Sequence, residues 1–321
     1  MKRQTSDDEF IDTFKQFQSV SEVAKTLGMS ERNAHQRRRQ IEQTRGIKLL
    51  SAAHNSVDRY DSGYEASFPD FQHVEIKNGL VLAGSDWHLV PGHKTTAHRA
   101  FLTMVREMKP AAVFDLGDLL DFSQISRHPR IGWDKGPNVK KEVEWAGDCL
   151  DEIKKSGPKA MVTKRTPGNH DLRFDGILAN GNPHFDGVKG FALGDHLPGW
   201  GQSWAIRVND QLTLKHRYKG GMHSPFNNTL WSGHSYATGH QHKQQVYPLT
   251  DERGDRWGVD VGCMASTYGP TFNYLEAAPR NWRSGFAVFT FVEGKLIPPE
   301  LVTVWDEEAG TITFRGQIIR V

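Results

Sequence analysis

From about residue 74 onward, short apolar runs of strand length alternate with longer segments whose apolar residues recur at helical spacing. The spacing predicts helices over residues 95–109 and 138–155, each with one apolar face. The last third is different and consists of strand-like runs separated by turns, at residues 257–265, 285–292, 301–305 and 311–319. We therefore expect an α/β fold of layered sheets with a β-rich C-terminal end.

The first 47 residues form a separate pattern of three short helical segments. Ser6, Ser19 and Ser30 each precede one segment, at the position where serine caps a helix, and a glutamate follows Ser6 and Ser19 at the capping-box spacing. Gly28 lies in the tight turn between the second and third segments. Two helices joined by such a turn are typical of the helix-turn-helix motif, and residues 19–34 resemble helix-turn-helix DNA-binding domains in layout.

This resemblance implies that the third segment is a recognition helix and that DNA is a partner. The residues that would bind DNA are Arg32, Asn33, Gln36, Arg37 and Arg38. The small core would come from Ala24, Leu27, Ala34 and Ile41. An alternative is a helical cap with a solvated basic face that docks on protein or dimerises the chain.

Residues 48–73 contain polar residues, glycine and tyrosine without periodicity. This composition predicts a linker between an all-α domain at residues 1–47 and a larger domain at residues 74–321.

Five strand-like runs of the larger domain each end in aspartate, asparagine or histidine. In open α/β sheets, the carboxyl ends of the strands are where ligands bind. The polar residues at these ends are Asp86 and His88, then Asp118, then Asn169, His170 and Asp171, then His216, and finally His240 and His242.

Aspartate, asparagine and histidine ligands without cysteine match a borderline metal such as zinc, manganese or iron. Two ions held close together need a shared carboxylate, for which Asp118 is the candidate. Such a pair can polarise a phosphoryl oxygen, lower the pKa of a bridging water and steady the attacking and leaving oxygens. The seven candidate ligands are Asp86, His88, Asp118, Asn169, His216, His240 and His242.

The ordered set Asp-x-His, Gly-Asp-x-x-Asp, Gly-Asn-His-Asp, strand-end His and Gly-His-x-His resembles the calcineurin-like metallophosphoesterase superfamily over residues 80–265. The resemblance implies a four-layer α/β/β/α sandwich with a dimetal site at the strand ends. It also implies that His170 is the catalytic histidine, and we group Asp171 with it as the residue that orients the loop. The implied ligands are Asp86, His88, Asp118 and His242 for one metal, and Asp118, Asn169, His216 and His240 for the other.

Some assignments stay open at this stage. Arg217 follows His216 where the family commonly has glycine, so His223 competes with His216 as the fourth-motif ligand. Asp121 is expected to hydrogen-bond to a metal ligand, with structuring of its loop as the alternative. Arg173 is the candidate for contacting a substrate phosphate.

Composition changes this picture little. The chain has 321 residues, with 40 Lys plus Arg against 38 Asp plus Glu, so overall charge says little about partners. Cys149 and Cys263 fit neither a disulfide framework nor a cysteine-rich zinc site. A polar start and the lack of a bilayer-length apolar run favour a cytoplasmic protein without a membrane partner.

We therefore expect a metal-dependent phosphoester hydrolase with two divalent ions, manganese first and zinc, iron or magnesium as alternatives. The leading substrate is DNA or a nucleotide, cleaved by a nuclease or phosphatase activity. One alternative is a phosphatase or phosphodiesterase of small nucleotides or phosphoproteins with a protein-docking N-terminal domain. Another is a DNA-binding regulator with an inactive phosphoesterase scaffold.

Overall fold

The structure is a computed structural model that describes residues 5–47, 49, 67–128, 133, 136–267, 272 and 280–321. The chain divides into two compact units, Met1–Ser67 and Phe68–Val321. The linker expected over residues 48–73 lies mostly outside the described residues, and at its end Phe71–Val74 forms strand β1.

The N-terminal unit contains three helices, α1 (Asp7–Phe17), α2 (Val20–Thr26) and α3 (Glu31–Arg45). The predicted caps are confirmed, because the side chains of Ser6, Ser19 and Ser30 each accept a hydrogen bond from a backbone N–H three residues later. Ala24, Ala34 and Ile41 are buried as expected, and Leu27 is half-buried. The core is larger than predicted, since it also includes Phe10, Ile11, Phe14, Val20, Val23 and Leu49.

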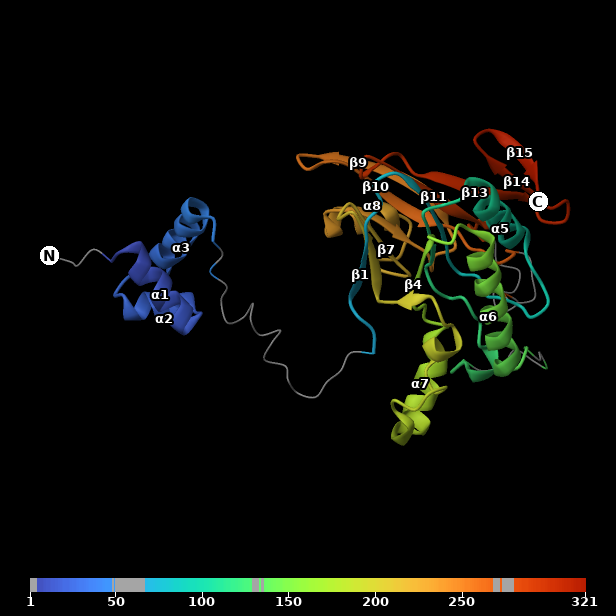
Figure 1. Cartoon of the computed structure of the whole chain (residues 1–321), viewed down its shortest axis with the longest axis horizontal. Helices are drawn as coiled ribbons and strands as arrows, with labels where there is room; N and C mark the ends of the chain where they lie inside the picture. Colours follow the sequence, from blue (N-terminus) through green and yellow to red (C-terminus); the bar gives the residue numbers. More distant parts are fainter. Residues whose placement is uncertain are drawn as a thin grey trace. The chain divides into compact units, whose positions relative to one another are not determined.

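The second unit is built on two β-sheets (Figure 1). The six-stranded sheet has the order β1 (Phe71–Val74), β6 (Ala205–Val208), β7 (Leu212–Lys215), β8 (Ser235–Thr238), β10 (Gly254–Val261) and β9 (Gln244–Asp251). The nine-stranded sheet has the order β15 (Gln317–Arg320), β14 (Thr311–Phe314), β13 (Glu300–Asp306), β11 (Gly285–Val292), β2 (Gly79–Gly84), β3 (Ala112–Asp115), β4 (Val162–Arg165) and β5 (Gly201–Gln202), with β12 (Lys295–Leu296) paired to β11.

Helices cover the outer faces of both sheets. Helices α5 (Thr96–Met108) and α6 (Val139–Ser156) pack against the nine-stranded sheet, and α8 (Ser224–Ser232) packs against β8, β9 and β10 (Figure 1). The remaining described helices are α7 (Leu172–Gly181), η1 (Ser123–Ile125), η2 (Pro183–Phe185) and η3 (Leu193–His196). This arrangement confirms the four-layer α/β/β/α sandwich expected from the sequence.

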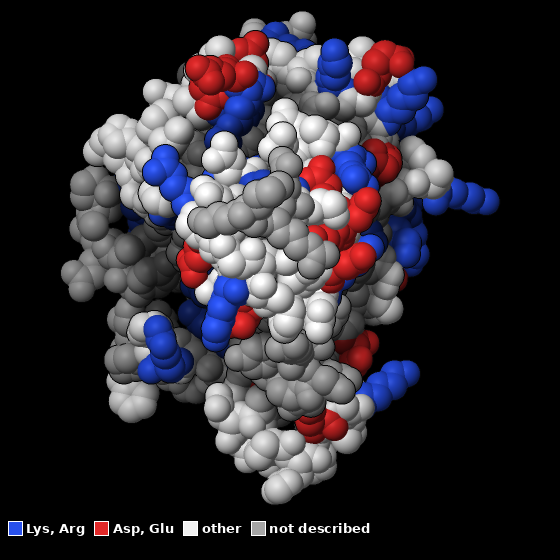
Figure 2. Space-filling model, turned by 90° about the vertical axis from the view of Figure 1, so that its left-hand side faces the viewer, with Lys and Arg blue, Asp and Glu red and all other residues white. Residues whose placement is uncertain are grey.

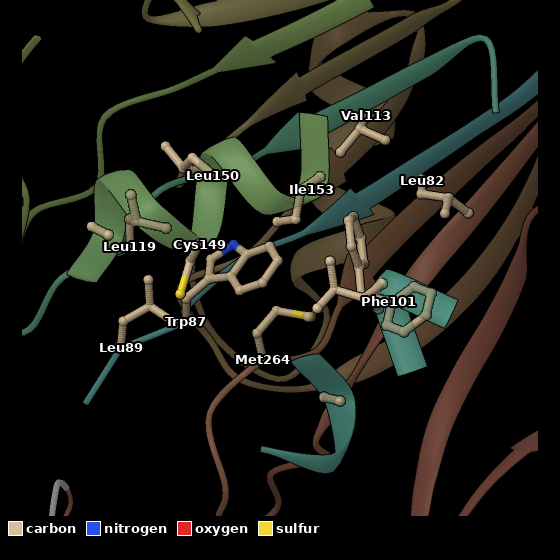
Figure 3. Packing of buried hydrophobic residues seen from close by; sticks show 14 of the residues in the cluster. Leu82, Trp87, Leu89, Phe101, Val113, Leu119, Cys149, Leu150, Ile153 and Met264 are labelled. Carbon is tan, nitrogen blue, oxygen red and sulfur yellow. The ribbon is translucent and has the colours of Figure 1, made fainter. Parts of the chain in front are cut away.

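Two apolar cores hold these layers together. One lies between the sheets and takes in Phe114 from β3, Leu214 from β7 and Phe289 from β11. The other lies between the nine-stranded sheet and its helices, where Trp87 packs beside Phe101 (Figure 3). Burying side chains of this size stabilises each layer contact by about 1.5–3 kcal/mol per residue.

The C-terminal end differs from the prediction in one respect. The single strand expected over residues 311–319 is a hairpin of β14 and β15. Arg315 and Gly316 form its turn, and both have a left-handed backbone, with φ of 49° and 75°. Glycine adopts this conformation readily, and a turn of this type matches the twist of the two strands. In the described part of the chain, every helix is too short or too polar to cross a bilayer.

Candidate metal centre

The five strand-like runs noted in the sequence are β2, β3, β4, β7 and β8. Strands β2, β3 and β4 are parallel neighbours in one sheet, and β7 and β8 are parallel neighbours in the other. Because parallel strands present their carboxyl ends at one edge, the loops that follow them converge. The polar residues predicted from the sequence are thereby brought together from both sheets.

Buried apolar neighbours fix the direction of the ligand side chains. Trp87 separates Asp86 from His88, and its ring lies 5.3 Å from that of His98. The Trp87 ring also lies 5.3 Å from that of Phe101 in the core (Figure 3). Leu119 and Leu120 are likewise fully buried beside Asp118. Backbone hydrogen bonds from Asp86 to Gly117 and from His88 to Asp118 then join the first two loops.

Five of the seven candidate ligands have a left-handed backbone, with φ between 39° and 66°. This conformation is uncommon outside glycine, although aspartate and histidine tolerate it better than most residues, and it costs of order 1 kcal/mol at each position. Sharp turns at the strand ends aim successive side chains at a common point, and that is the geometry a ligand cluster needs. The five residues are Asp86, His88, Asp118, His240 and His242.

Asp86, His88 and His242 form the first cluster, with their ligand atoms within 4.8 Å of one another. His242 Nε2 lies 3.1 Å from Asp86 Oδ1, and His88 Nδ1 donates to Asp121 at 3.3 Å. Burial favours the neutral form of Asp86, but His242 outweighs it and lowers the pKa of Asp86 to about 2. A charged, buried carboxylate surrounded by imidazoles is suited to binding a cation.

Two ring nitrogens of this cluster support a metal role directly. His88 Nε2 and His242 Nδ1 are buried and have no hydrogen-bond partner within the described ranges. A buried polar atom without a partner costs free energy of order 1–3 kcal/mol. The Asp121 carboxylate holds His88 by its other nitrogen, as carboxylates commonly do with metal-binding histidines. The donor set therefore fits a divalent metal.

Asp118, His216 and His240 form the second cluster. His216 Nδ1 donates to Leu116 O at 2.8 Å, which leaves Nε2 3.3 Å from Asp118 Oδ2 and 3.2 Å from Asn169 Oδ1. Burial alone would lower the pKa of His216, but Asp118 raises it to about 9. All four ligands implied for the second metal thus meet, since the ring of His240 lies 5.1 Å from that of His216.

His170 lies at the edge of both clusters. Its backbone N–H donates to Asp118 Oδ1 at 2.7 Å, and its Nδ1 donates to Asp121 Oδ1 at 3.1 Å. Although burial opposes it, Asp121 and Asp118 raise the pKa of His170. Arg173 Nη2 is 3.2 Å from His170 Nε2, so a cation and an imidazole lie side by side.

Two candidates are not part of these clusters. Asp171 is buried, and its carboxylate accepts from Leu120 N, Gly168 N and Arg165 Nη2, so it orients the loop and is not placed to act on a substrate. His223 is exposed at the start of α8, whereas His216 lies in the second cluster. The geometry therefore favours His216 over His223.

Sequence reasoning missed a buried ion pair beneath the metal loops. Asp115 and Arg165 are register partners in β3 and β4 and lie 3.4 Å apart. In the sequence, each of the two is a single charged residue at the end of an apolar run. Such a residue is a weak signal, because the sequence does not show which residue it pairs with. Sequence reasoning also missed Phe272 and Trp282, whose rings lie 5.4 Å and 4.3 Å from that of His242.

Helix α3 of the N-terminal unit presents only part of the predicted DNA-binding set. Arg32, Asn33 and Gln36 are exposed. Arg37 instead pairs with Asp7 at 3.0 Å and also donates to Thr5 O. Arg38 pairs with Glu42 at 3.1 Å and lies over the ring of Phe14, so both arginines are engaged within the unit.

No protein-family model matches the chain. The gene 54 proteins of Mycobacterium phages L5 and D29 are 27% and 25% identical to it over 240 and 237 residues, in each case 64% of this chain and 86% of the phage protein. Vps29 of Entamoeba histolytica, complexed with Zn²⁺, superposes with a TM-score of 0.40 and 14% identity over 75% of this chain and 98% of that one. The Pseudomonas putida nuclease MPE gives a TM-score of 0.31 and 15% identity over 68% and 86%. Similarities at this level do not assign a substrate, so the chemistry depends on the side chains described above.

Proposed function

We propose that the second unit hydrolyses phosphoester bonds with the help of two divalent metal ions. We expect both ions to be manganese. The observation that carries this proposal is the pair of adjoining aspartate–histidine clusters, the first of which has two buried ring nitrogens without a hydrogen-bond partner among the described residues. Asp86, His88 and His242 would hold one ion. Asp118 would be shared with the other, which Asn169, His216 and His240 complete.

Metal ions bound at this position supply Lewis acidity toward a phosphoryl oxygen and a lowered pKa for a water nucleophile. The remaining steps belong to the protein. Asp121 fixes the ring of His170 through Nδ1, which leaves Nε2 on the side of Arg173. His170 would donate a proton from Nε2 to the leaving alkoxide, because Asp121 already holds its Nδ1. In this proposal Arg173 would hydrogen-bond to the phosphate.

The test is hydrolysis of bis(p-nitrophenyl) phosphate by full-length protein, with manganese, zinc, iron and magnesium added in turn. His170→Ala should retain bound metal and lose about 10²- to 10⁴-fold in kcat, because it removes only the proton donor. His223→Ala is the matched control, since His223 is an exposed histidine outside the clusters. If the wild-type protein does not hydrolyse the ester with any of the four metals, the proposal is contradicted. Full activity in the His170 variant would remove the assigned role of that residue.

We further propose that DNA is the polymer on which this unit acts, with the N-terminal unit as a DNA contact. The exposed polar and basic side chains Arg32, Asn33 and Gln36 on α3 support this, together with the exposed Arg39. Changing Arg32 and Arg39 to alanine should weaken duplex binding and reduce the magnitude of its log–log salt slope by about 0.9 per lost phosphate contact. Unchanged binding would favour the alternative in which this unit docks on protein.

A further inference from the structure

The outer face of the six-stranded sheet carries a concavity of about 450 Å³. Helix α8 packs on β8, β9 and β10, whereas side chains of β1, β6, β7 and β8 line the concavity. Register places Arg207, Thr213 and Tyr236 in one row across β6, β7 and β8, on the face opposite the buried Leu214. The row forms the floor of the concavity.

The walls combine aromatic rings with positive charges. Phe71 and Tyr218 are 42% and 48% exposed, and Tyr218 stacks on Tyr236 at 5.4 Å. Arg207 lies 4.4 Å from the centre of the Phe71 ring. Lys215 enters the same space from the end of β7. Exposed flat rings next to cations are the elements with which proteins bind single-stranded nucleic acid.

The charges of the concavity have few counter-charges. Among the residues that the structure describes, neither Arg207 nor Lys215 forms an ion pair, and Arg207 Nε is buried without a hydrogen-bond partner. Asp70 is the single carboxylate in the lining. Protein interfaces are depleted in lysine at their cores, so the unneutralised Lys215 favours a phosphate-bearing occupant over a protein.

The cationic–aromatic character continues at the rim of the concavity. Trp231 of α8 is 68% exposed, and Lys219 lies 4.1 Å from the centre of its ring. Along the chain, Lys215 immediately precedes His216 of the second cluster, so strand β7 leads from the concavity into a metal loop. Figure 2 shows one face of the molecule, on which acidic and basic side chains are interspersed.

We infer that this concavity binds a single-stranded segment of a nucleic acid, with bases stacked on Phe71 and Tyr218 and phosphates held by Arg207 and Lys215. The inference rests on the proposed phosphoesterase function and narrows its substrate to strands with unpaired bases next to the scissile phosphate. Stacking is tolerant of sequence, because every base has a π-face, so little base preference is expected at this surface.

The experiment measures binding of a fluorescein-labelled dT12 oligonucleotide to the full chain by anisotropy, in EDTA so that cleavage is absent. Tyr218→Ala should raise Kd about 5- to 150-fold, the range for loss of one stacked base. Lys215→Gln should reduce the magnitude of the log–log salt slope by about 0.7, the value for one phosphate on a single strand. Tyr247→Ala, another exposed tyrosine at 45% but outside the concavity, is the matched control and should bind as wild type does.

A second measurement separates this surface from the N-terminal unit. An oligonucleotide with 5-iodouracil, cross-linked by light and mapped by mass spectrometry, should attach to Tyr218 or Trp231. Cross-links confined to residues 5–47, or dT12 affinities of the Tyr218 and Lys215 variants within twofold of wild type, would overturn the inference and leave the face to a protein partner.

Hydrolysis of bis(p-nitrophenyl) phosphate is measured in parallel, so that the two proposals can fail separately. If the ester is hydrolysed and dT12 is not bound, this inference fails and the proposed function stands. If dT12 binds at this surface and no ester is hydrolysed with any metal, the proposed function fails, and with it the role of this surface in presenting a substrate.

Discussion

Arg165 is predicted to be the residue on which the metal loops most depend, although it contacts none of the ligands. It is 1% exposed, with Nη2 3.1 Å from Asp171 Oδ2 and Nε 3.4 Å from Asp115 Oδ2. Asp115 in turn accepts from Gly117 N, and Asp171 accepts from Gly168 N. The arginine therefore links the loop that carries Asp118 to the loop that carries Asn169 and His170.

Arg165→Met removes the cation and leaves two buried carboxylates facing each other. Burial already raises the pKa of Asp115 to about 7 against the effect of Arg165, so loss of the arginine shifts it further toward the neutral form. Removing one partner of a buried ion pair costs about 3–5 kcal/mol, and we expect that loss in the free energy of unfolding. Displaced metal loops should also weaken metal affinity about 10- to 100-fold.

Urea denaturation followed by tryptophan fluorescence measures this effect in the second unit alone, because all nine tryptophans lie at or beyond residue 87. Arg256→Met is the matched control. Arg256 is also buried, at 6% exposure, but its partner Asp251 has a side chain 38% exposed and neither belongs to a cluster. We expect a loss of about 1 kcal/mol there and unchanged metal affinity. An Arg165 variant within 1 kcal/mol of wild type that binds metal normally would refute the reasoning.

Two further predictions concern a buried acid and a glycine. Burial and the neighbouring Asp121 raise the pKa of Glu142 from 4.5 to about 8, so its stabilisation is complete below pH 4.5 and is lost as pH rises through 8. In metal-free wild-type protein, the free energy of unfolding should therefore fall by about 1.4 kcal/mol per pH unit between pH 4.5 and pH 8, and Glu142→Gln should remove this fall. If urea denaturation gives the same pH dependence for the variant and the wild type, the prediction is contradicted. Gly239→Ala should abolish metal binding, because a Cβ there would lie 1.8 Å from Ser85 Oγ. Gly176→Ala, which meets nothing within 4 Å, should bind metal as wild type does, and a Gly239 variant with full metal content would count against tight loop packing.

Features with a local signal were predictable from the sequence. The serine caps of the N-terminal helices and the helices at 95–109 and 138–155 depend on residues three or four positions apart, and the structure has them. The five strand ends were also predictable. An apolar run that ends in aspartate or histidine can be recognised within one segment, without knowing which strand pairs with it.

Features that depend on distant partners were not predictable. Asp115 and Arg165 lie fifty positions apart and become neighbours only through the pairing of β3 with β4. The pairing of Arg37 with Asp7 across the three-helix unit likewise joins residues thirty positions apart. The division of the five strands between two sheets likewise leaves no local trace, since every run is apolar in the same way.

We propose that seven side chains from both sheets hold a pair of cations that share Asp118. Equilibrium dialysis of metal-stripped protein against manganese, with metal counted by mass spectrometry, tests it most directly. We predict two tightly bound ions per chain in the wild type and loss of both from Asp118→Asn, while Asp210→Asn, at an exposed carboxylate, keeps both. A wild type that binds no manganese, or an Asp118 variant that still binds two ions with unchanged affinity, would contradict it.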